Sequence, residues 1–118
     1  RYYPRKYEGT KEEEREPGVI ELYYESNSKD EYWGGDNIVI SPWGDLIICE
    51  DNGSRGCKLL GIDQRGSLYA IGQVVDSSSE IAGVCFSPDG NTMFLNIQDE
   101  GKTIAIYGDW SKIKSLKA

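Results

Sequence analysis

The sequence contains no histidine and only three cysteines, Cys49, Cys57 and Cys85, among its 118 residues. Without histidine, the chain cannot by itself supply a Ser-His-Asp or Cys-His catalytic group, or a zinc site that uses histidine. Three cysteines are too few for a disulfide framework, and their odd number leaves at least one thiol unpaired. The sequence is compatible with a disulfide bridge between Cys49 and Cys57 and equally with two buried free thiols. It therefore does not indicate whether the protein resides in an oxidising or a reducing compartment.

Long hydrophobic runs and an excess of basic residues are also missing. No apolar stretch approaches the ~20 residues that span a bilayer, which predicts no membrane span. No signal peptide is visible, and the chain opens at Arg1 without an initiator methionine, which favours a piece of a longer protein. The formal charge of −7 predicts no nucleic-acid partner, because phosphate backbones require a basic surface. An acidic balance is compatible with divalent cations and equally with an ordinary solvated surface.

The most informative stretch runs from residue 36 to residue 51. Two apolar runs, 38–40 and 46–48, flank the turn Ser41-Pro42-Trp43-Gly44. Proline presets φ early in such a turn, and glycine supplies the positive φ that closes it. The pattern predicts a β-hairpin.

The outer ends of this hairpin are acidic. Asp36 and Asn37 precede the first run, and Glu50 and Asp51 follow the second. Because a hairpin brings its outer ends together, we expect these residues to form an acidic cluster at one end of the paired strands.

The hairpin pattern recurs along the chain. Ser41-Pro42-Trp43-Gly44 returns as Ser87-Pro88-Asp89-Gly90, with Asp63-Gln64-Arg65-Gly66 as a degenerate copy between them. The turn glycines are spaced by 22 and 24 residues, so two hairpins take 46 residues, close to the ~40–50 of a four-stranded propeller blade. The strands expected besides the central hairpin are 19–24, 58–63, 67–71, 81–86, 92–97 and 103–107.

The expected fold class is all-β, made of β-propeller blades. Runs that are apolar on both faces suit sheets packed between neighbouring sheets, although a two-sheet sandwich stays open. At about 46 residues per blade the chain supplies about two and a half blades, which favours a fragment of a larger propeller. We expect a partial strand and polar loop over 1–17, blades over 18–110 and a C-terminal tail over 111–118.

Several segments, in this order and spacing, resemble the C-terminal region of PhoX-type alkaline phosphatases over about residues 18–110. The segments that carry the resemblance are Gly35-Asp36-Asn37, Ser41-Pro42-Trp43-Gly44-Asp45-Leu46, Cys49-Glu50-Asp51, 80–90, 94–98, Ala105-Ile106 and Gly108-Asp109-Trp110.

This resemblance implies a six-bladed propeller with a calcium and iron cluster that hydrolyses phosphate esters. It also implies export by the twin-arginine route, and hence a periplasmic or extracellular location. The N-terminal blades, with other metal ligands and the cysteine that binds iron, lie outside these residues, so we expect this chain alone to be inactive. The expected partners are a phosphate ester substrate, the remaining propeller blades and, through open blade edges, other copies of the chain.

The candidate metal ligands are Asp36, Asn37, Glu50 and Glu80. Calcium takes ~6–8 oxygen ligands, so carboxylates and amides from several strands must converge on it. Structural alternatives stay open: a strand-start cap for Asp36, a solvated strand end for Glu50 and the end of a serine linker for Glu80. We assign Asp51 to loop geometry and name no catalytic residue.

Two other functions stay open from the sequence. The chain is also compatible with a non-catalytic propeller segment that serves as a binding or scaffold module. A calcium-dependent esterase or lactonase on a similar propeller is the third interpretation.

Overall fold

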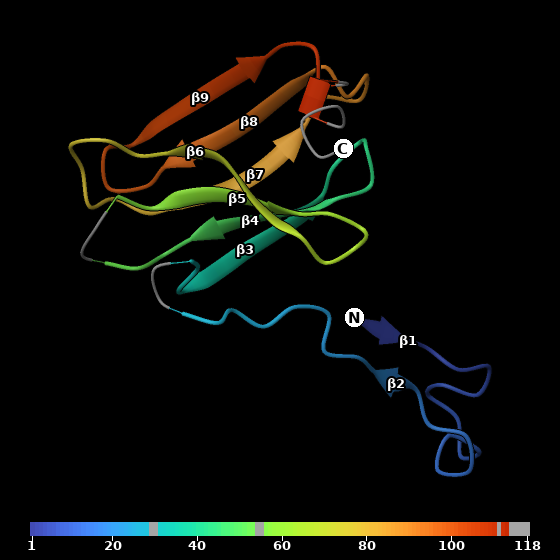
Figure 1. Cartoon of the computed structure of the whole chain (residues 1–118). Coiled ribbons are helices and arrows are strands. Elements are labelled where there is room, and N and C mark those ends of the chain that lie inside the picture. Colours follow the sequence, from blue (N-terminus) through green and yellow to red (C-terminus); the bar gives the residue numbers. More distant parts are fainter. Residues whose placement is uncertain (29–30, 54–55, 111, 114–118) are drawn as a thin grey trace.

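The computed structural model describes residues 1–28, 31–53, 56–110 and 112–113. Its regular elements are nine β-strands, which confirms the all-β class (Figure 1). The strands are β1 Tyr2–Tyr3, β2 Val19–Ile20, β3 Gly35–Ile40, β4 Leu46–Glu50, β5 Lys58–Ile62, β6 Leu68–Gln73, β7 Ile81–Phe86, β8 Thr92–Ile97 and β9 Lys102–Tyr107. The described part of the chain contains no helix long and apolar enough to cross a membrane. Most of the tail expected over 111–118 lies outside the described residues.

The strands form three antiparallel sheets from neighbours in the sequence. β1 pairs with β2, β3 to β6 form a four-stranded sheet in chain order, and β7 to β9 form a three-stranded sheet in chain order. The two larger sheets lie face to face, and the described strands do not close into a ring (Figure 1). This arrangement fits the predicted hairpins, and it does not by itself give a number of blades.

The three predicted turns share one geometry. In each, the glycine at the fourth position donates its backbone N–H to the carbonyl of the first residue: Gly44 to Ser41 at 2.9 Å, Gly66 to Asp63 at 2.9 Å and Gly90 to Ser87 at 2.8 Å. The glycine φ angles are 88°, 82° and 73°, a region that strains residues with a Cβ. The sequence repeat is therefore a repeat of structure.

Strand alternation assigns each side chain of the four-stranded sheet to one of two faces. The row Val39, Ile47, Gly61 and Tyr69 faces the β7–β9 sheet, and the Tyr69 ring lies over Gly61, where a Cβ would collide with it. The next row along the strands faces the opposite side: Ile38, Ile48, Leu60 and Ala70.

The hydrophobic core fills the space between the two larger sheets. Its members are apolar side chains from both sheets and from the first turn: Trp43, Ile47, Cys49, Cys57, Leu59, Ile81, Val84, Met93, Leu95 and Ile97. Cys49 and Cys57 are both free thiols in this core, so the structure has no bridge between them, and Cys85 is free and exposed. Trp43 packs edge-on against Phe86 and stacks on Trp110 at a centroid distance of 5.5 Å.

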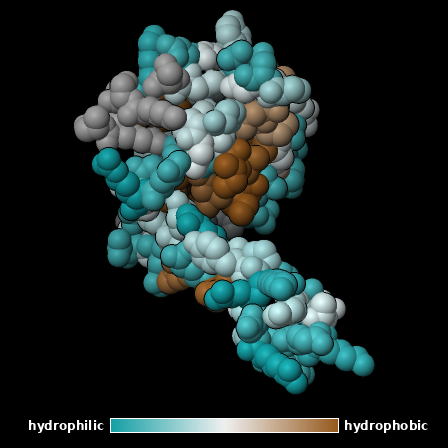
Figure 2. Space-filling model, turned by 90° about the vertical axis from the view of Figure 1, so that its right-hand side faces the viewer, coloured by the Kyte–Doolittle hydropathy of each residue, from teal (hydrophilic) through white to brown (hydrophobic). Residues whose placement is uncertain are grey.

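The N-terminal segment extends away from the two larger sheets (Figure 1). The strand predicted over 19–24 ends at Ile20, and Leu22 is exposed, so this prediction was too long. Its partner strand stops at Tyr3 because Pro4 has no N–H to continue the ladder. Figure 2 shows hydrophobic side chains gathered on one face of the main body, above a mostly hydrophilic extension.

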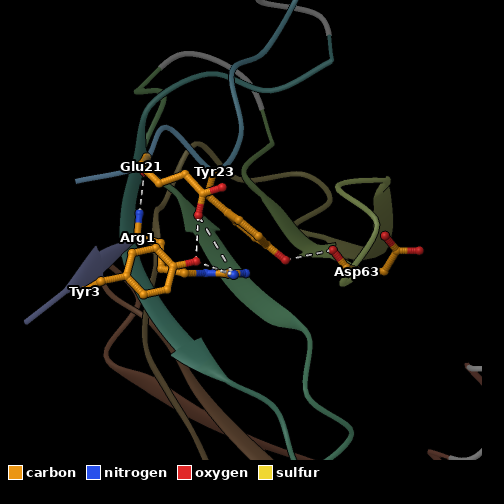
Figure 3. A network of polar contacts seen from close by, with 5 residues as sticks. All are labelled: Arg1, Tyr3, Glu21, Tyr23 and Asp63. Atoms are coloured by element: carbon orange, nitrogen blue, oxygen red, sulfur yellow. Dashed lines mark hydrogen bonds and ion pairs between the residues drawn. The ribbon is translucent and has the colours of Figure 1, made fainter. Parts of the chain in front are cut away.

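A polar network ties this segment together and fastens it to the body (Figure 3). Arg1 and Glu21 exchange backbone hydrogen bonds of 2.6 and 2.7 Å, and the Tyr3 hydroxyl donates to the Glu21 carboxylate at 2.8 Å. The Arg1 guanidinium lies 4.3 Å from the centre of the Tyr23 ring. The Tyr23 hydroxyl then donates to the carbonyl of Asp63 at 3.0 Å, in the turn between β5 and β6.

A buried carboxylate joins the first turn to β6. One oxygen of Asp45 accepts hydrogen bonds from the Trp43 indole at 2.8 Å and from the Tyr69 hydroxyl at 2.7 Å. The Asp45 backbone N–H donates to the Ser41 hydroxyl at 2.9 Å. The local sequence pattern of the turn does not reveal this link between Asp45 and β6.

We expect Asp45→Ala to lower the free energy of unfolding by about 1–3 kcal/mol, because the buried Trp43 indole and the half-buried Tyr69 hydroxyl lose an acceptor. Urea denaturation followed by tryptophan fluorescence measures the change. Asp89→Ala removes an exposed turn carboxylate from the third hairpin and should cost less. If both variants lose the same free energy of unfolding, the buried network stabilises the fold no more than an exposed turn carboxylate does.

Candidate functional site

The acidic residues of the two larger sheets gather at one end of their strands. Asp36 lies near the start of β3 and Asp51 directly follows β4, while Glu80 directly precedes β7 and Asp99 follows β8 by two residues. Because β3 and β7 pack side by side, these ends are adjacent. We call Asp36, Asp51, Glu80 and Asp99 the acidic end.

A β-bulge positions Asp36. In the pairing of β3 with β4, Gly35 lies opposite Glu50 and Asn37 lies opposite Cys49, so Asp36 is an extra residue without a partner across the ladder. Bulges re-aim a side chain and bend the strand, and they are frequent next to active sites. Asp36 is exposed, and its neighbour Asn37 is half-buried.

Glu80 shows the electrostatics of the acidic end most directly. Partial burial raises the pKa of Glu80, and a hydrogen bond with the Asp51 carboxyl raises it further. The negative charges of Asp51, Asp36 and Asp99 act on this pKa in the same direction. Each influence on the pKa of Glu80 that comes from the described residues raises it, so the fold brings carboxylates together here against their mutual repulsion.

Backbone and hydroxyl groups fix the strand ends that carry these acids. The buried Ser79 hydroxyl accepts the Asp99 backbone N–H at 2.9 Å, and the Glu80 carbonyl accepts the Gln98 N–H at 3.2 Å. These bonds hold the start of β7 against the end of β8. The spacing between Glu80 and Asp99 is therefore a property of the folded backbone.

Glu50 lies on the opposite face of the sheet. Its side chain is 0% exposed. Its carboxylate accepts hydrogen bonds from the backbone N–H groups of Trp33 at 3.1 Å and Lys58 at 2.9 Å, and from the Asn52 amide at 3.2 Å. Burial raises the pKa of Tyr32, whose hydroxyl lies against Gly35, and the negative charge of Glu50 raises it further. Glu50 thus fastens residues 32–35 to the ends of β4 and β5.

Cys49 lies on the same face as the acidic end. Burial raises the pKa of its thiol to about 11, and the charges of Asp36 and Glu80 contribute to the increase. The thiol is therefore protonated at neutral pH. A protonated, buried thiol is a poor nucleophile and a poor metal ligand.

The structure thus brings two of the predicted site residues, Asp36 and Glu80, into one electrostatic group. Asn37 lies beside Asp36, while Glu50 points to the other side of the sheet. Two members of the group, Asp51 and Asp99, were missed as partners of Glu80. Strand alternation could have found them, because each follows a core residue, Cys49 or Ile97, by two positions.

The group offers only oxygen donors to a ligand, which is the chemistry that calcium prefers. Among the residues described by the structure, no three His, Cys, Asp or Glu side chains are already placed to hold a metal ion. The assignment of Asp36, Asn37, Glu50 and Glu80 as metal ligands therefore stays a prediction.

The fold and the acidic end together define an all-β protein of consecutive antiparallel hairpins with a concentration of carboxylates at one end. A family model described as alkaline phosphatase PhoX matches residues 7–101, about four fifths of the chain. The chain belongs to this family, which confirms the resemblance found in the sequence. No curated protein and no solved structure matches the chain.

Glu80→Gln should increase thermal stability at pH 8 and have little effect near pH 4. Because the folded state raises the pKa of Glu80, its stabilising contribution is complete below the ordinary carboxyl pKa and is lost as pH rises through the raised value. Melting temperatures across this pH range, in a buffer with chelator, measure the effect. Glu14→Gln removes one exposed charge from the N-terminal segment, and an equal gain in that control would contradict the local explanation.

Glu50→Gln should have the opposite sign and destabilise the chain by about 1–3 kcal/mol. The amide replaces one accepting oxygen with a donor that faces a backbone N–H of Trp33 or Lys58. Urea denaturation of this variant beside Glu80→Gln gives the comparison. A stable Glu50→Gln chain would mean that the buried carboxylate does not hold residues 32–35.

Proposed function

We propose that this chain is the C-terminal part of a metal-dependent phosphatase that hydrolyses phosphate esters, and that it is inactive alone. The observation that carries the proposal is the match to the PhoX alkaline phosphatase family over residues 7–101. The acidic end supports it with an arrangement of carboxylates whose repulsion a bound cation would relieve.

The proposal includes a six-bladed propeller. Consecutive up-and-down strands support blades over an immunoglobulin-type sandwich, which uses Greek-key connections between its sheets. In this interpretation the β3–β6 sheet is a whole blade, and the β1–β2 pair and the β7–β9 sheet belong to its two neighbours. The chain then contributes two, four and three strands to successive blades.

The proposed metal ligands from this chain are Asp36, Asn37 and Glu80, with Asp51 added from the geometry. Their oxygen donors fit calcium, and the rest of the coordination shell, together with the ligands of iron, is assigned to blades outside this chain. Glu50 stays in the predicted set, although its hydrogen bonds support a role in positioning residues 32–35. Metal ions bound there would polarise phosphoryl oxygens and offset the charge that develops as the ester bond breaks.

The substrate class and location follow from the family and belong to the same proposal. We assign a phosphate monoester as substrate and a periplasmic or extracellular location to the parent protein. No catalytic side chain is assigned within this chain, since the carboxylates named would hold metal and would not attack phosphorus.

The experiment compares metal content and phosphatase activity of this chain with those of its longer parent. We expect calcium, iron and activity in the parent, and none of the three in the chain alone. In the parent, Asp36→Asn and Glu80→Gln should each weaken calcium binding about tenfold or more, measured by calorimetry. Asp89→Asn is the matched control, because Asp89 lies in a turn at the other end of the strands.

A parent that lacks metal and activity would overturn the phosphatase proposal and leave the scaffold module. Calcium-dependent cleavage of carboxylic esters or lactones, without cleavage of phosphate esters, would identify the third class. Unchanged calcium affinity in Asp36→Asn and Glu80→Gln would remove these residues from the site and leave the family assignment intact.

A further inference from the structure

The loop that follows β4 contains an asparagine directly before a glycine. Among the asparagines of the sequence, only Asn52 has this neighbour, Gly53. Asparagine is a thermolabile residue. Its side-chain carbonyl carbon can be attacked by the backbone nitrogen of the next residue, and glycine favours this attack because it has no Cβ and adopts a wide range of backbone angles. Asn52 is therefore the asparagine of this chain with the highest intrinsic tendency to lose its amide.

The glycine of this pair has room to move. Gly53 is exposed and has a φ of 64°. Apart from its neighbours in the chain, no described residue lies within 4 Å of the position that a Cβ would take on Gly53. Packing by the described residues therefore does not prevent the Gly53 backbone from approaching the Asn52 side chain.

The amide of Asn52, by contrast, is held in place by Glu50. Asn52 is 7% exposed, and its side-chain nitrogen donates a hydrogen bond to a carboxylate oxygen of Glu50 at 3.2 Å. The same oxygen accepts the Lys58 backbone N–H at 2.9 Å, which fixes its position. Deamidation requires the amide nitrogen to leave as ammonia into water. The nitrogen must therefore separate from Glu50 before it can leave.

We propose that Asn52 is a site of spontaneous deamidation, and that its release from Glu50 limits the rate. The Gly53 nitrogen loses its proton and forms a bond to Cγ of Asn52, while the bond between Cγ and Nδ2 breaks and ammonia leaves. Water then opens the resulting succinimide at either carbonyl carbon, which gives aspartate or isoaspartate at position 52. The net reaction consumes one water molecule and needs no oxidant. The inference does not rest on phosphatase activity.

The product of deamidation places a second carboxylate against Glu50. A carboxylate oxygen takes the place of the nitrogen that donates to Glu50, so an attractive buried contact becomes a repulsive one. Glu50 also accepts the backbone N–H of Trp33, so the repulsion weakens the attachment of residues 32–35. Asp36 directly follows these residues. We therefore expect deamidation to loosen the start of β3, which belongs to the acidic end.

The first test follows deamidation of Asn52 at pH 8 by mass spectrometry of proteolytic fragments. We expect the folded chain to react about tenfold or more slowly than a peptide of residues 50–56, because separating a hydrogen bond from a buried charge costs free energy. Glu50→Gln and Glu50→Asp should each accelerate the reaction of the folded chain about tenfold or more. Asp45→Ala weakens the opposite end of the same hairpin and is the matched control, with a much smaller effect. Circular dichroism verifies that each variant is folded.

The second test separates the charge of the product from the loss of the amide. Asn52→Asp and Asn52→Ala both remove the hydrogen bond to Glu50, and only Asn52→Asp adds a carboxylate. We expect Asn52→Asp to have the lower melting temperature and the faster hydrogen exchange over residues 32–35. Equal values in the two variants would reject the proposed effect of the product.

Three results of the first test would overturn the proposed site. One is an equal rate in the folded chain and the peptide, which would mean that Glu50 does not protect the amide. Another is equal acceleration by the Glu50 variants and Asp45→Ala, which would assign the reaction to global unfolding. The third is a folded Glu50→Gln or Glu50→Asp chain in which Asn52 stays intact while the peptide reacts.

Discussion

The packing of the β3–β6 sheet on the β7–β9 sheet determines on which face of the sheet each acidic side chain lies. Ile47 and Met93 are fully buried in this contact, and burial of each such side chain contributes about 1.5–3 kcal/mol. Because side chains alternate along a strand, burying Ile47 and Cys49 sends Glu50 to the far face and Asp51 toward β7. The position of the acidic end is thus a consequence of how the core is packed.

Much of this fold could be predicted from local sequence patterns. The β7 and β8 boundaries match the predicted runs 81–86 and 92–97, and all three predicted turns are present, because turn chemistry and β-propensity are local. The groups that face one another were harder to predict. The bulge at Asp36 changes the alternation that sequence spacing implies, and the partners of Glu50 come from a loop and another strand. Such features depend on tertiary packing.

Glu50 and Glu80 show how one residue type takes two roles through its surroundings. The fold supplies Glu50 with backbone donors, which compensate for the loss of water around a buried charge. The fold surrounds Glu80 with other acids, so its pKa is raised and its charge is unfavourable. A folded protein tolerates repulsion between carboxylates when partial exposure to water reduces the loss of stability and when a bound ligand offsets the negative charge. Glu80 is therefore the more informative of the two about binding.

The bulges connect the acidic end with the edges of the sheets. Those in β3 and β7 lie close to the acidic end, where Asp36 is an extra residue and Gly83 follows Glu80 by three positions. A bulge at such a position both aims a side chain and bends the strand away from edge pairing. β9 carries no residue of the acidic end, so no bulge is needed there to aim a carboxylate. The register of β9 with β8 is continuous, and Lys102 at the start of β9 supplies the charge on this edge, which is one of the features that limit edge-to-edge pairing.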